Sequence, residues 1–219
     1  MTEKGDTGVW LETLIKTFQP DPDIELTGTP EEMKSSASWK AFSISFAAAI
    51  PPGPFGMATI IPELAAITKI QINLVYRIAK YYGKQQEVTP SIVIHILATA
   101  FGIVLGRKLL QKVGTRIIVK ALSNKVIKTL AQKLGTRIAA RVVARVGARW
   151  IPILTAPIFG AFSKSQTTNV GNNAIKVFSS DIEFEKTLKC SQGHDVMEDA
   201  KFCAECGEKM EDDADSEKA

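Results

Sequence analysis

The chain has 219 residues, of which 45% are hydrophobic and 23% are charged, and its formal net charge is +4. This composition excludes a wholly disordered chain and a collagen-like scaffold, and the length allows one or two domains. Three cysteines, two of them spaced as Cys203-x-x-Cys206, suit a metal site in a reducing compartment better than a disulfide framework. The N-terminus lacks a basic and then apolar start, so we do not expect a cleaved signal peptide.

The charge is distributed very unevenly. Residues 1–38 carry eight acids against three bases, residues 39–179 carry two acids against nineteen bases, and residues 180–219 carry thirteen acids against five bases. The regional net charges are therefore −5, +17 and −8. A basic, apolar middle region should attract a polyanion, either a phospholipid surface or nucleic acid, unless the acidic ends fold back onto it.

The first 36 residues predict a short helix followed by a linker. Apolar residues recur at helical spacing over 9–18, which indicates a short amphipathic helix that ends before Pro20. Residues 21–36 are rich in proline, glycine and acids, and this composition is typical of an exposed linker.

The next segments predict packed helices. Residues 41–62 carry no charge, but a Pro-Pro-Gly-Pro sequence at 51–54 divides them into a small-residue helix, a sharp turn and the start of another helix. That second helix, over 62–82, has an apolar stripe and a polar stripe, as expected of a helix facing a core. Thr89 and Pro90 then predict the N-cap and first turn of the following helix.

Residues 88–106 form a charge-free run of 19 residues that a basic pair follows at once. As one helix this run would be ~28 Å long, close to the thickness of a bilayer's hydrocarbon core. Ala98, Gly102 and Gly106 recur every four residues, and such a ridge allows close helix contact, including contact between two copies of the chain. Two interpretations stay open: a membrane span or deep insertion, or a buried core helix in which His95 is a hydrogen-bonded core residue.

The stretch over 107–149 carries twelve bases and no acid. Its sequence QKVGTRI at 111–117 returns as QKLGTRI at 132–138, and this offset of 21 residues is about six helical turns, so two helical copies would present similar faces. In the second half the bases recur every four residues along one side of a predicted helix. The residues predicted to bind an anionic surface are Lys112, Arg116, Lys120, Lys133, Arg137, Arg141, Arg145 and Arg149.

Three interpretations of this basic helix stay open. An anionic membrane surface would attract it, and the adjoining segments are apolar and rich in glycine or alanine. A solvated or partner-covered face is the second, although an ordinary exposed helix interleaves acids with its bases. Nucleic acid is the third, but few aromatic residues are present for base stacking. Residues 150–162, a charge-free run with two prolines, predict a bent, buried or interfacial segment.

The C-terminal region carries a metal-binding pattern. Cys190, His194, Cys203 and Cys206 form two short-spaced pairs of soft or borderline donors, which suits tetrahedral Zn²⁺. Because four protein ligands leave no open position for water, this pattern indicates a structural zinc. Residues 186–210 are too few for an independent apolar core, so the metal would supply their folding free energy.

Two parts of the chain resemble known families. The stretch KCSQGHDVMEDAKFCAECGEKM resembles the short zinc ribbons appended to many bacterial proteins, with His194 in place of the commoner cysteine. Within residues 40–179, AIPPGPFGMATIIPELAAITKIQINLVYRIAKYYGK and ARWIPILTAPIFGAFSKSQTTNVGNNAIKVF resemble the EcsC family and the related YcjF-type, GTPase-associated bacterial proteins. This resemblance implies an α-helical, membrane-associated protein and supplies no catalytic residues.

We therefore predict an all-α fold of packed, partly membrane-associated helices with a small C-terminal zinc ribbon. The expected organisation is an amphipathic helix and acidic linker (1–36), a basic, apolar helical domain (37–180), the zinc ribbon (186–210) and a disordered acidic tail (211–219). No phosphate loop, nucleophile elbow or dinucleotide fingerprint is present in the sequence, so we do not expect an enzyme.

The expected function is non-enzymatic binding or scaffolding at the cytoplasmic face of the bacterial inner membrane, integral or peripheral. The basic helix would face anionic phospholipid, and the zinc ribbon would lie in the cytoplasm and offer a surface to a protein partner. Two alternatives are a soluble nucleic-acid-binding protein that uses residues 107–149, and a bilayer-disrupting or channel-like protein built from the two charge-free regions.

Overall fold

The computed structural model describes residues 20–21, 24–50, 60–103, 110–113, 116–119, 129, 133, 136, 152–184, 187–197, 201–203 and 206–210. The predicted helix over 9–18, the proline-rich turn over 51–54 and the tail over 211–219 lie outside the described residues.

The described part of the chain is mostly helical. Its helices are α2 (Pro30–Ala49), α4 (Ile60–Tyr81), α5 (Pro90–Ala100) and α8 (Pro152–Phe178), with a short 3-10 helix η1 (Gln85–Glu87) between α4 and α5. Five short strands accompany the helices: β1 (Leu110–Val113), β2 (Arg116–Val119), β3 (Asp181–Phe184), β4 (Thr187–Lys189) and β5 (Asp195–Met197). The all-α prediction is therefore confirmed only as a mostly helical fold.

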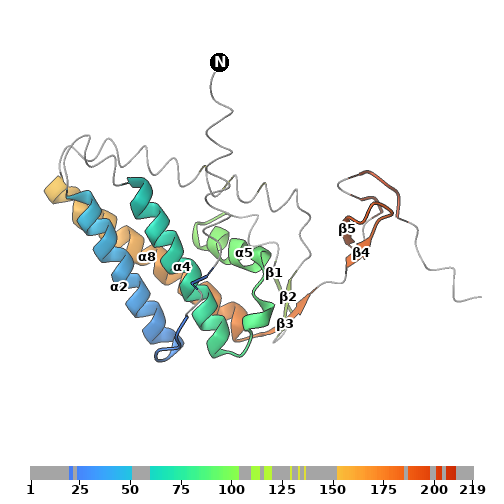
Figure 1. Ribbon diagram of the computed structural model, residues 1–219, viewed down its shortest axis with the longest axis horizontal. Coiled ribbons are helices and arrows are strands. Elements are labelled where there is room, and N and C mark those ends of the chain that lie inside the picture. Colours follow the sequence, from blue (N-terminus) through green and yellow to red (C-terminus); the bar gives the residue numbers. More distant parts are fainter. Residues whose placement is uncertain are drawn as a thin grey trace, which may run out of the picture.

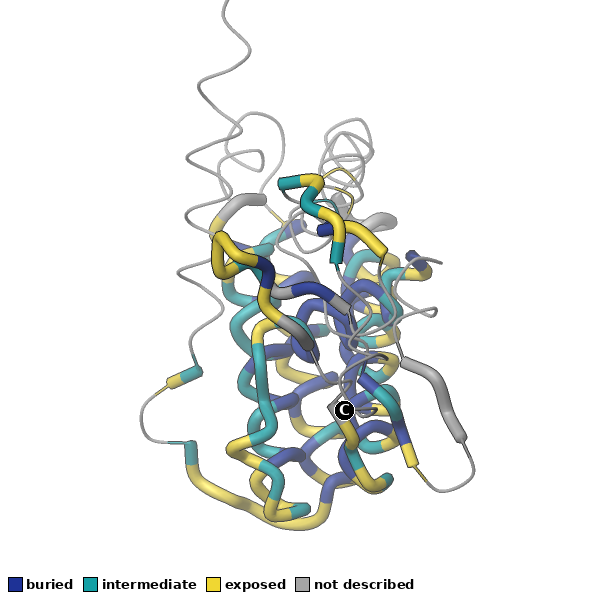
Figure 2. The backbone as a smooth tube through the Cα atoms, turned by 90° about the vertical axis from the view of Figure 1, so that its right-hand side faces the viewer, coloured by how far each residue is buried: buried dark blue, intermediate teal, exposed yellow. Residues whose placement is uncertain are grey.

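Helices α2, α4 and α8 lie side by side, and α5 packs against α8 (Figure 1). Residues early in α2 contact residues late in α8, as in the hydrogen bond from Lys34 Nζ to Asn172 Oδ1, so these two helices run antiparallel. Burial concentrates along the inner sides of the helices (Figure 2). The largest fully buried side chains include Met33, Ile72, Leu74, Ile78, Ile92, Ile96, Leu97 and Phe178.

Helix α2 begins within the predicted linker. The hydroxyl of Thr29 accepts a hydrogen bond from the Glu32 amide, and the Glu32 carboxylate accepts one from the Thr29 amide, which completes a capping box before Pro30. Met33 and Ala37 then lie in the core. The linker predicted to reach residue 36 therefore ends at Thr29, because this local cap starts a helix whose apolar residues pack against the bundle.

Replacing Thr29 with alanine should lower the free energy of unfolding by ~1 kcal/mol, because the substitution leaves an amide of the first turn of α2 without its acceptor. A urea titration followed by circular dichroism measures the change. Ser43→Ala is the matched control in α2: its hydroxyl bonds only the preceding turn, so this variant should lose little or no stability. Equal losses in the two variants would contradict the capping role.

Helix α4 confirms the predicted helix over 62–82 and begins two residues earlier. Helix α5 confirms the predicted cap, because the Thr89 hydroxyl accepts from the Ile92 amide and Pro90 occupies the first turn. Yet α5 has only 11 residues, and Gly102 beyond its end has a φ of 73°. A helix of this length is ~16 Å long, about half of a bilayer's hydrocarbon core.

Helix α5 is therefore a buried core helix. Eight of its residues are buried, including Ala98 and His95. The prediction that Ala98, Gly102 and Gly106 form a ridge on one helix is wrong for Gly102, because that residue lies beyond the end of α5. Gly106 lies outside the described residues. Among the described helices, none combines the length and the apolar character that a bilayer crossing requires.

The first copy of the sequence repeat forms strands, which corrects the prediction of a helix there. Strand β1 pairs antiparallel with β2, and β2 pairs in parallel with β3, which follows α8. Ile117 and Val119 are buried whereas Arg116 is exposed, so the residues alternate as in a strand that packs on one face. The described residues of the second copy, Lys133 and Thr136, are helical, so their backbone conformation differs from that of the first copy.

A row of buried polar side chains joins the three bundle helices. Ser45 of α2 donates to Glu63 Oε1 of α4 at 2.6 Å and lies 2.5 Å from the Ser163 hydroxyl of α8. One turn further along α8, and two turns further along α4, Gln71 Nε2 donates to the Thr167 hydroxyl at 3.2 Å. A buried polar group without a partner is costly, so the helices must pack in the register that lets these side chains bond one another.

Candidate metal centre

Two short hairpins build the C-terminal module, which we define as residues 187–210. In the first hairpin, β4 and β5 pair antiparallel and enclose the turn that carries Cys190 and His194. The Cys190 amide donates to the His194 carbonyl at 3.0 Å, and the Gly193 amide donates to the Cys190 carbonyl at 2.8 Å. Gly193 has a φ of 80°, which favours glycine, and so permits this tight turn.

The second hairpin repeats this arrangement. Phe202 pairs with Lys209 in an isolated antiparallel bridge, and the Gly207 amide donates to the Cys203 carbonyl at 2.9 Å. Gly207 directly follows Cys206 and has a φ of 75°, close to that of Gly193, which precedes His194. The local sequence alone can form each turn, because the hydrogen bonds of each hairpin join residues less than ten positions apart.

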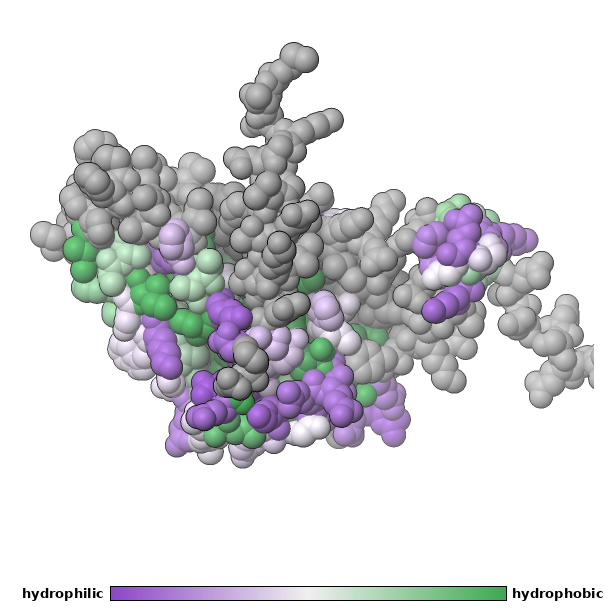
Figure 3. All heavy atoms as spheres, viewed as in Figure 1, coloured by the Kyte–Doolittle hydropathy of each residue, from purple (hydrophilic) through white to green (hydrophobic). Residues whose placement is uncertain are grey.

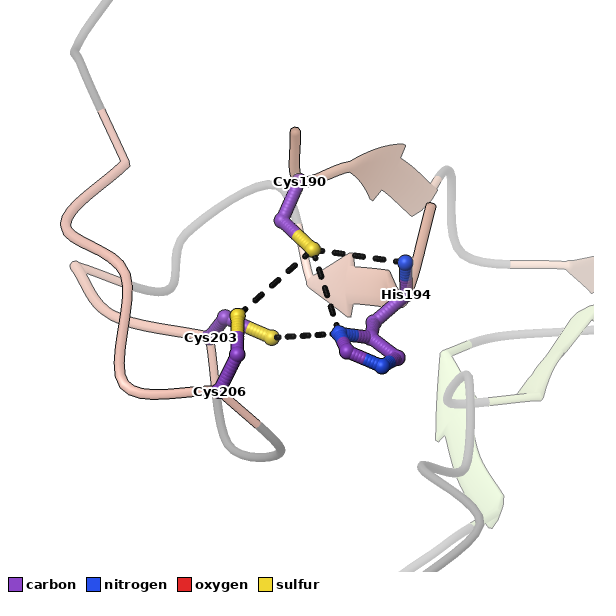
Figure 4. A group of neighbouring side chains, drawn as sticks. All are labelled: Cys190, His194, Cys203 and Cys206. Carbon is purple, nitrogen blue, oxygen red and sulfur yellow. Dashed lines mark hydrogen bonds between the residues drawn. The ribbon is translucent and has the colours of Figure 1, made fainter. Parts of the chain in front are cut away.

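The two turns bring the four predicted ligands together (Figure 4). Their ligand atoms all lie within 4.8 Å of one another. Cys190 Sγ lies 3.7 Å from Cys206 Sγ, and His194 Nδ1 lies 3.3 Å from Cys190 Sγ and 3.8 Å from Cys203 Sγ. A tetrahedral Zn²⁺ with ordinary bond lengths separates two sulfur ligands by ~3.8 Å and a sulfur from a nitrogen by ~3.6 Å. These three separations are close to the edges of a zinc tetrahedron, so the cluster can bind a metal ion such as zinc.

The closeness of the three cysteine thiols also favours a bound cation. The backbone amide of Glu208 lowers the pKa of the Cys206 thiol, but burial and the neighbouring thiols of Cys203 and Cys190 together raise it to about 11. Thiolates this close repel one another, whereas a divalent cation stabilises all three of them and releases their protons. The His194 amide also donates to Cys190 Sγ at 3.3 Å, a bond that a thiolate strengthens.

Glu208 joins the two hairpins and was not identified from the sequence. Its Oε2 accepts from the amide of Ser191 at 3.0 Å and from the hydroxyl of Ser191 at 2.8 Å. The carboxylate therefore links the turn after Cys190 to the second hairpin. The only signal in the sequence for this role was that Glu208 stands two residues after Cys206. That signal was too weak to identify it, because acids are common throughout this region.

Among its described residues, the module has only a small apolar cluster. Val196 is the buried aliphatic residue beside Cys190 and Cys203, and Met210 is partly buried against them. A module of this length cannot offset the entropy of its own ordering with a cluster of this size. Metal binding would supply the missing free energy.

The predicted anionic-surface residues have mixed placements. Lys112 lies in β1, and Arg116 in β2 forms an ion pair with Glu183 of β3 at 2.7 Å. Lys133 is helical and exposed. Lys120, Arg137, Arg141, Arg145 and Arg149 lie outside the described residues.

His95 is buried in α5, as the core interpretation predicted. Burial lowers its pKa to about 4, so its imidazole is neutral at neutral pH. We predicted that the imidazole is hydrogen-bonded, and this holds for one of its two nitrogens. Nε2 lies 3.5 Å from the Thr99 hydroxyl, whereas Nδ1 has no partner among the described residues.

Comparison with models of known protein families finds no match to this chain, and comparisons with curated proteins and with solved structures find none either. The resemblance of residues 40–179 to the EcsC family and the related YcjF-type proteins therefore stays a prediction from the residues quoted above. The same holds for the resemblance of the C-terminal module to bacterial zinc ribbons.

Proposed function

We propose that this protein is a non-enzymatic binding or scaffold protein that attaches peripherally to an anionic phospholipid surface, as at the cytoplasmic face of a bacterial inner membrane. Its helical bundle makes the membrane contact. Its C-terminal module holds a structural Zn²⁺ and offers a separate surface to a protein partner.

The observation that carries the membrane contact is an exposed apolar patch at one end of the bundle, where α2 ends and α8 begins (Figure 3). Its most exposed members are Ile158, at 64%, and Ile50, at 55%. Large apolar side chains gathered on a surface mark a site of contact with a protein or a membrane. We call this surface the α2/α8 patch, and it comprises Trp39, Phe46, Ile50, Ile158 and Phe162.

Contacts between the two helices support the patch. Trp39, Phe42 and Phe46 form a ladder along α2, with ring centroids 5.4 Å and 5.9 Å apart. Phe42 lies against Gly160 of α8, where a side chain on the glycine would collide with its ring. The Lys164 ammonium of α8 lies 3.5 Å from the centre of the Trp39 ring. A tryptophan beside a lysine is typical of a membrane interface, because each side chain has an apolar part and a polar end.

The charge of the sequence before α8 favours an anionic surface over a neutral one. The bases at 133–149 stand in the sequence directly before α8, whose first turns carry Ile158 and Phe162 of the patch. The chain carries no Asp or Glu between Glu87 and Asp181 to compensate these bases. Apolar insertion and attraction to anionic headgroups act together in peripheral attachment.

The chemistry of the metal centre supports a structural role. Four protein ligands would complete the tetrahedral coordination of Zn²⁺, which leaves no coordination position for a substrate or a reactive water. The nearby Glu208 holds a turn in place through Ser191.

Vesicle binding tests the membrane contact. The double variant Ile50→Ser/Ile158→Ser should bind phosphatidylglycerol vesicles about tenfold or more weakly, because each exposed isoleucine loses burial in the interface. Phosphatidylcholine vesicles should bind the unaltered chain less well, and added salt should weaken its binding to the anionic vesicles. Co-sedimentation with vesicles measures each of these effects.

The matched control is Leu26→Ser/Tyr81→Ser, which removes two exposed apolar side chains outside the patch and should leave binding unchanged. Equal losses in the two double variants, or no binding to anionic vesicles at low salt, would overturn the membrane proposal. If single-stranded or duplex nucleic acid displaces the chain from vesicles at matched phosphate concentration, nucleic-acid binding replaces it.

A further inference from the structure

A cavity of about 690 Å³ between α5, β2 and α8 is a second candidate binding site. Small-molecule sites in proteins typically occupy ~300–1,000 Å³ and combine apolar walls with a few polar groups. The polar groups here come from one face of α8 and from two positions of α5 one turn apart. The described lining residues are His95, Thr99, Ala100, Gly102, Ile117, Asn169, Asn172, Asn173, Lys176 and Val177.

His95 gives this cavity a buried polar group without a partner. The residue is 5% exposed and lines the cavity, and its Nδ1 has no hydrogen-bond partner among the described residues. Buried polar atoms are almost always hydrogen-bonded in native proteins, to protein, water or ligand. A molecule in the cavity would therefore complete the hydrogen bonding of this imidazole.

The lining favours an anion with many acceptor atoms. Three asparagine amides, the Thr99 hydroxyl and the imidazole can all donate hydrogen bonds, and Lys176 adds a positive charge. The Asn172 amide oxygen already accepts a bond from Lys34 at 2.8 Å, so this residue can offer the cavity only its amide nitrogen, a donor. Every described lining residue comes from the segment between Glu87 and Asp181, which holds no acid, so the lining itself contributes a positive charge and no negative one.

We propose that this cavity binds a small organic phosphate, with the phosphate group at Lys176, the asparagines and His95, and the organic part against Ile117 and Val177. A phosphate offers more acceptor oxygens to this set of donors than a carboxylate does. The volume also exceeds that of inorganic phosphate, which leaves room for an attached organic group. The cavity lies toward the C-terminal end of α8 and the α2/α8 patch at its start, so this inference does not depend on membrane attachment.

Imidazole NMR of the full chain, loaded with zinc, tests the proposal directly. The chain has two histidines, His95 and His194, so a variant that lacks one of them assigns the imidazole resonances of both. Glycerol 3-phosphate should shift the His95 resonances saturably and raise the pKa of His95 from about 4, because a nearby anion favours the charged imidazole. His194 should not respond. Glycerol is the matched uncharged probe and should produce no saturable shift.

Two variants identify the cavity as the site. Lys176→Gln should weaken binding of glycerol 3-phosphate about tenfold or more, and Asn173→Ala should weaken it about threefold or more. Lys164→Gln removes the same charge from the same helix but lies over Trp39, outside the lining, and should bind normally. Lys176 is exposed, so its variant should fold, and circular dichroism checks this.

Four results would overturn the proposal: no saturable shift with glycerol 3-phosphate, an equal response to glycerol, an equal loss in Lys164→Gln, or a response of His95 to phosphatidylglycerol vesicles alone. The last result would assign the phosphate chemistry to a lipid headgroup instead of a soluble molecule. The first three of these outcomes involve no vesicles, so they do not depend on whether vesicles bind the α2/α8 patch.

Discussion

Replacing Cys203 with serine should abolish stoichiometric zinc binding and unfold the C-terminal module while the helical bundle stays folded. Cys203 is 2% exposed, belongs to the second hairpin and lies 3.8 Å from His194 Nδ1 through its Sγ, so its loss removes one of the four donors. Structural zinc contributes an apparent ~10–16 kcal/mol in small zinc-dependent modules. Metal analysis of the purified chain and amide hydrogen exchange of residues 187–210 measure the two effects.

Phe202→Ala is the matched control, because Phe202 is adjacent in sequence but 58% exposed. This variant should keep its zinc and its protected amides. A Cys203→Ser variant that retains one zinc per chain would contradict the ligand assignment. Loss of protection in α2, α4 and α8 would contradict the independence of the module, whose own buried cluster contains residues of the module alone.

Replacing Phe178 with alanine should lower the free energy of unfolding of the helical bundle by ~3–5 kcal/mol, because the substitution leaves a cavity in a well-packed core. Phe178 is fully buried at the end of α8. Phe162 lies on the same helix but is 39% exposed in the α2/α8 patch, so Phe162→Ala should cost only ~1 kcal/mol or less. Urea unfolding followed by helical circular dichroism measures both losses.

The same pair of variants separates stability from membrane attachment. Phe162→Ala should weaken binding to phosphatidylglycerol vesicles, whereas Phe178→Ala should bind normally at temperatures where it stays folded. If both variants lose stability equally, α8 is packed differently from the arrangement described here. If Phe178→Ala alone loses vesicle binding, the patch does not make the membrane contact.

Short-range features of the chain were predictable from the residues alone. The candidate metal ligands fall into two pairs, each within five residues and each with an adjacent glycine of positive φ, so local geometry brings the donors of a pair together. Helix α4 was predictable from its two stripes, and the start of α5 from Thr89 and Pro90. In each of these cases the deciding interactions join residues that are close in sequence.

Features that depend on distant residues were not predictable. The sequence at 111–117 returns 21 positions later, and this offset fits two helical copies. Residues 110–113 and 116–119 nevertheless form strands, because β2 pairs with β3, which lies beyond α8 in the sequence. The run over 88–106 was long enough to suggest a span, but α5 ends at Ala100, inside the core. Pairing and burial against distant segments override local preference in both cases.

The sequence by itself determined the donor set of the metal centre, the acid-free basic middle region and the predominance of helix, because composition, spacing and local caps are properties of the chain alone. Only the tertiary structure decided which surfaces those helices present. The α2/α8 patch joins residues more than 100 positions apart, and the His95 cavity joins α5 to α8 across the whole basic stretch. The physical reason is that a surface or cavity forms where separate helices pack, and packing follows from the complementarity of side chains that no local pattern specifies.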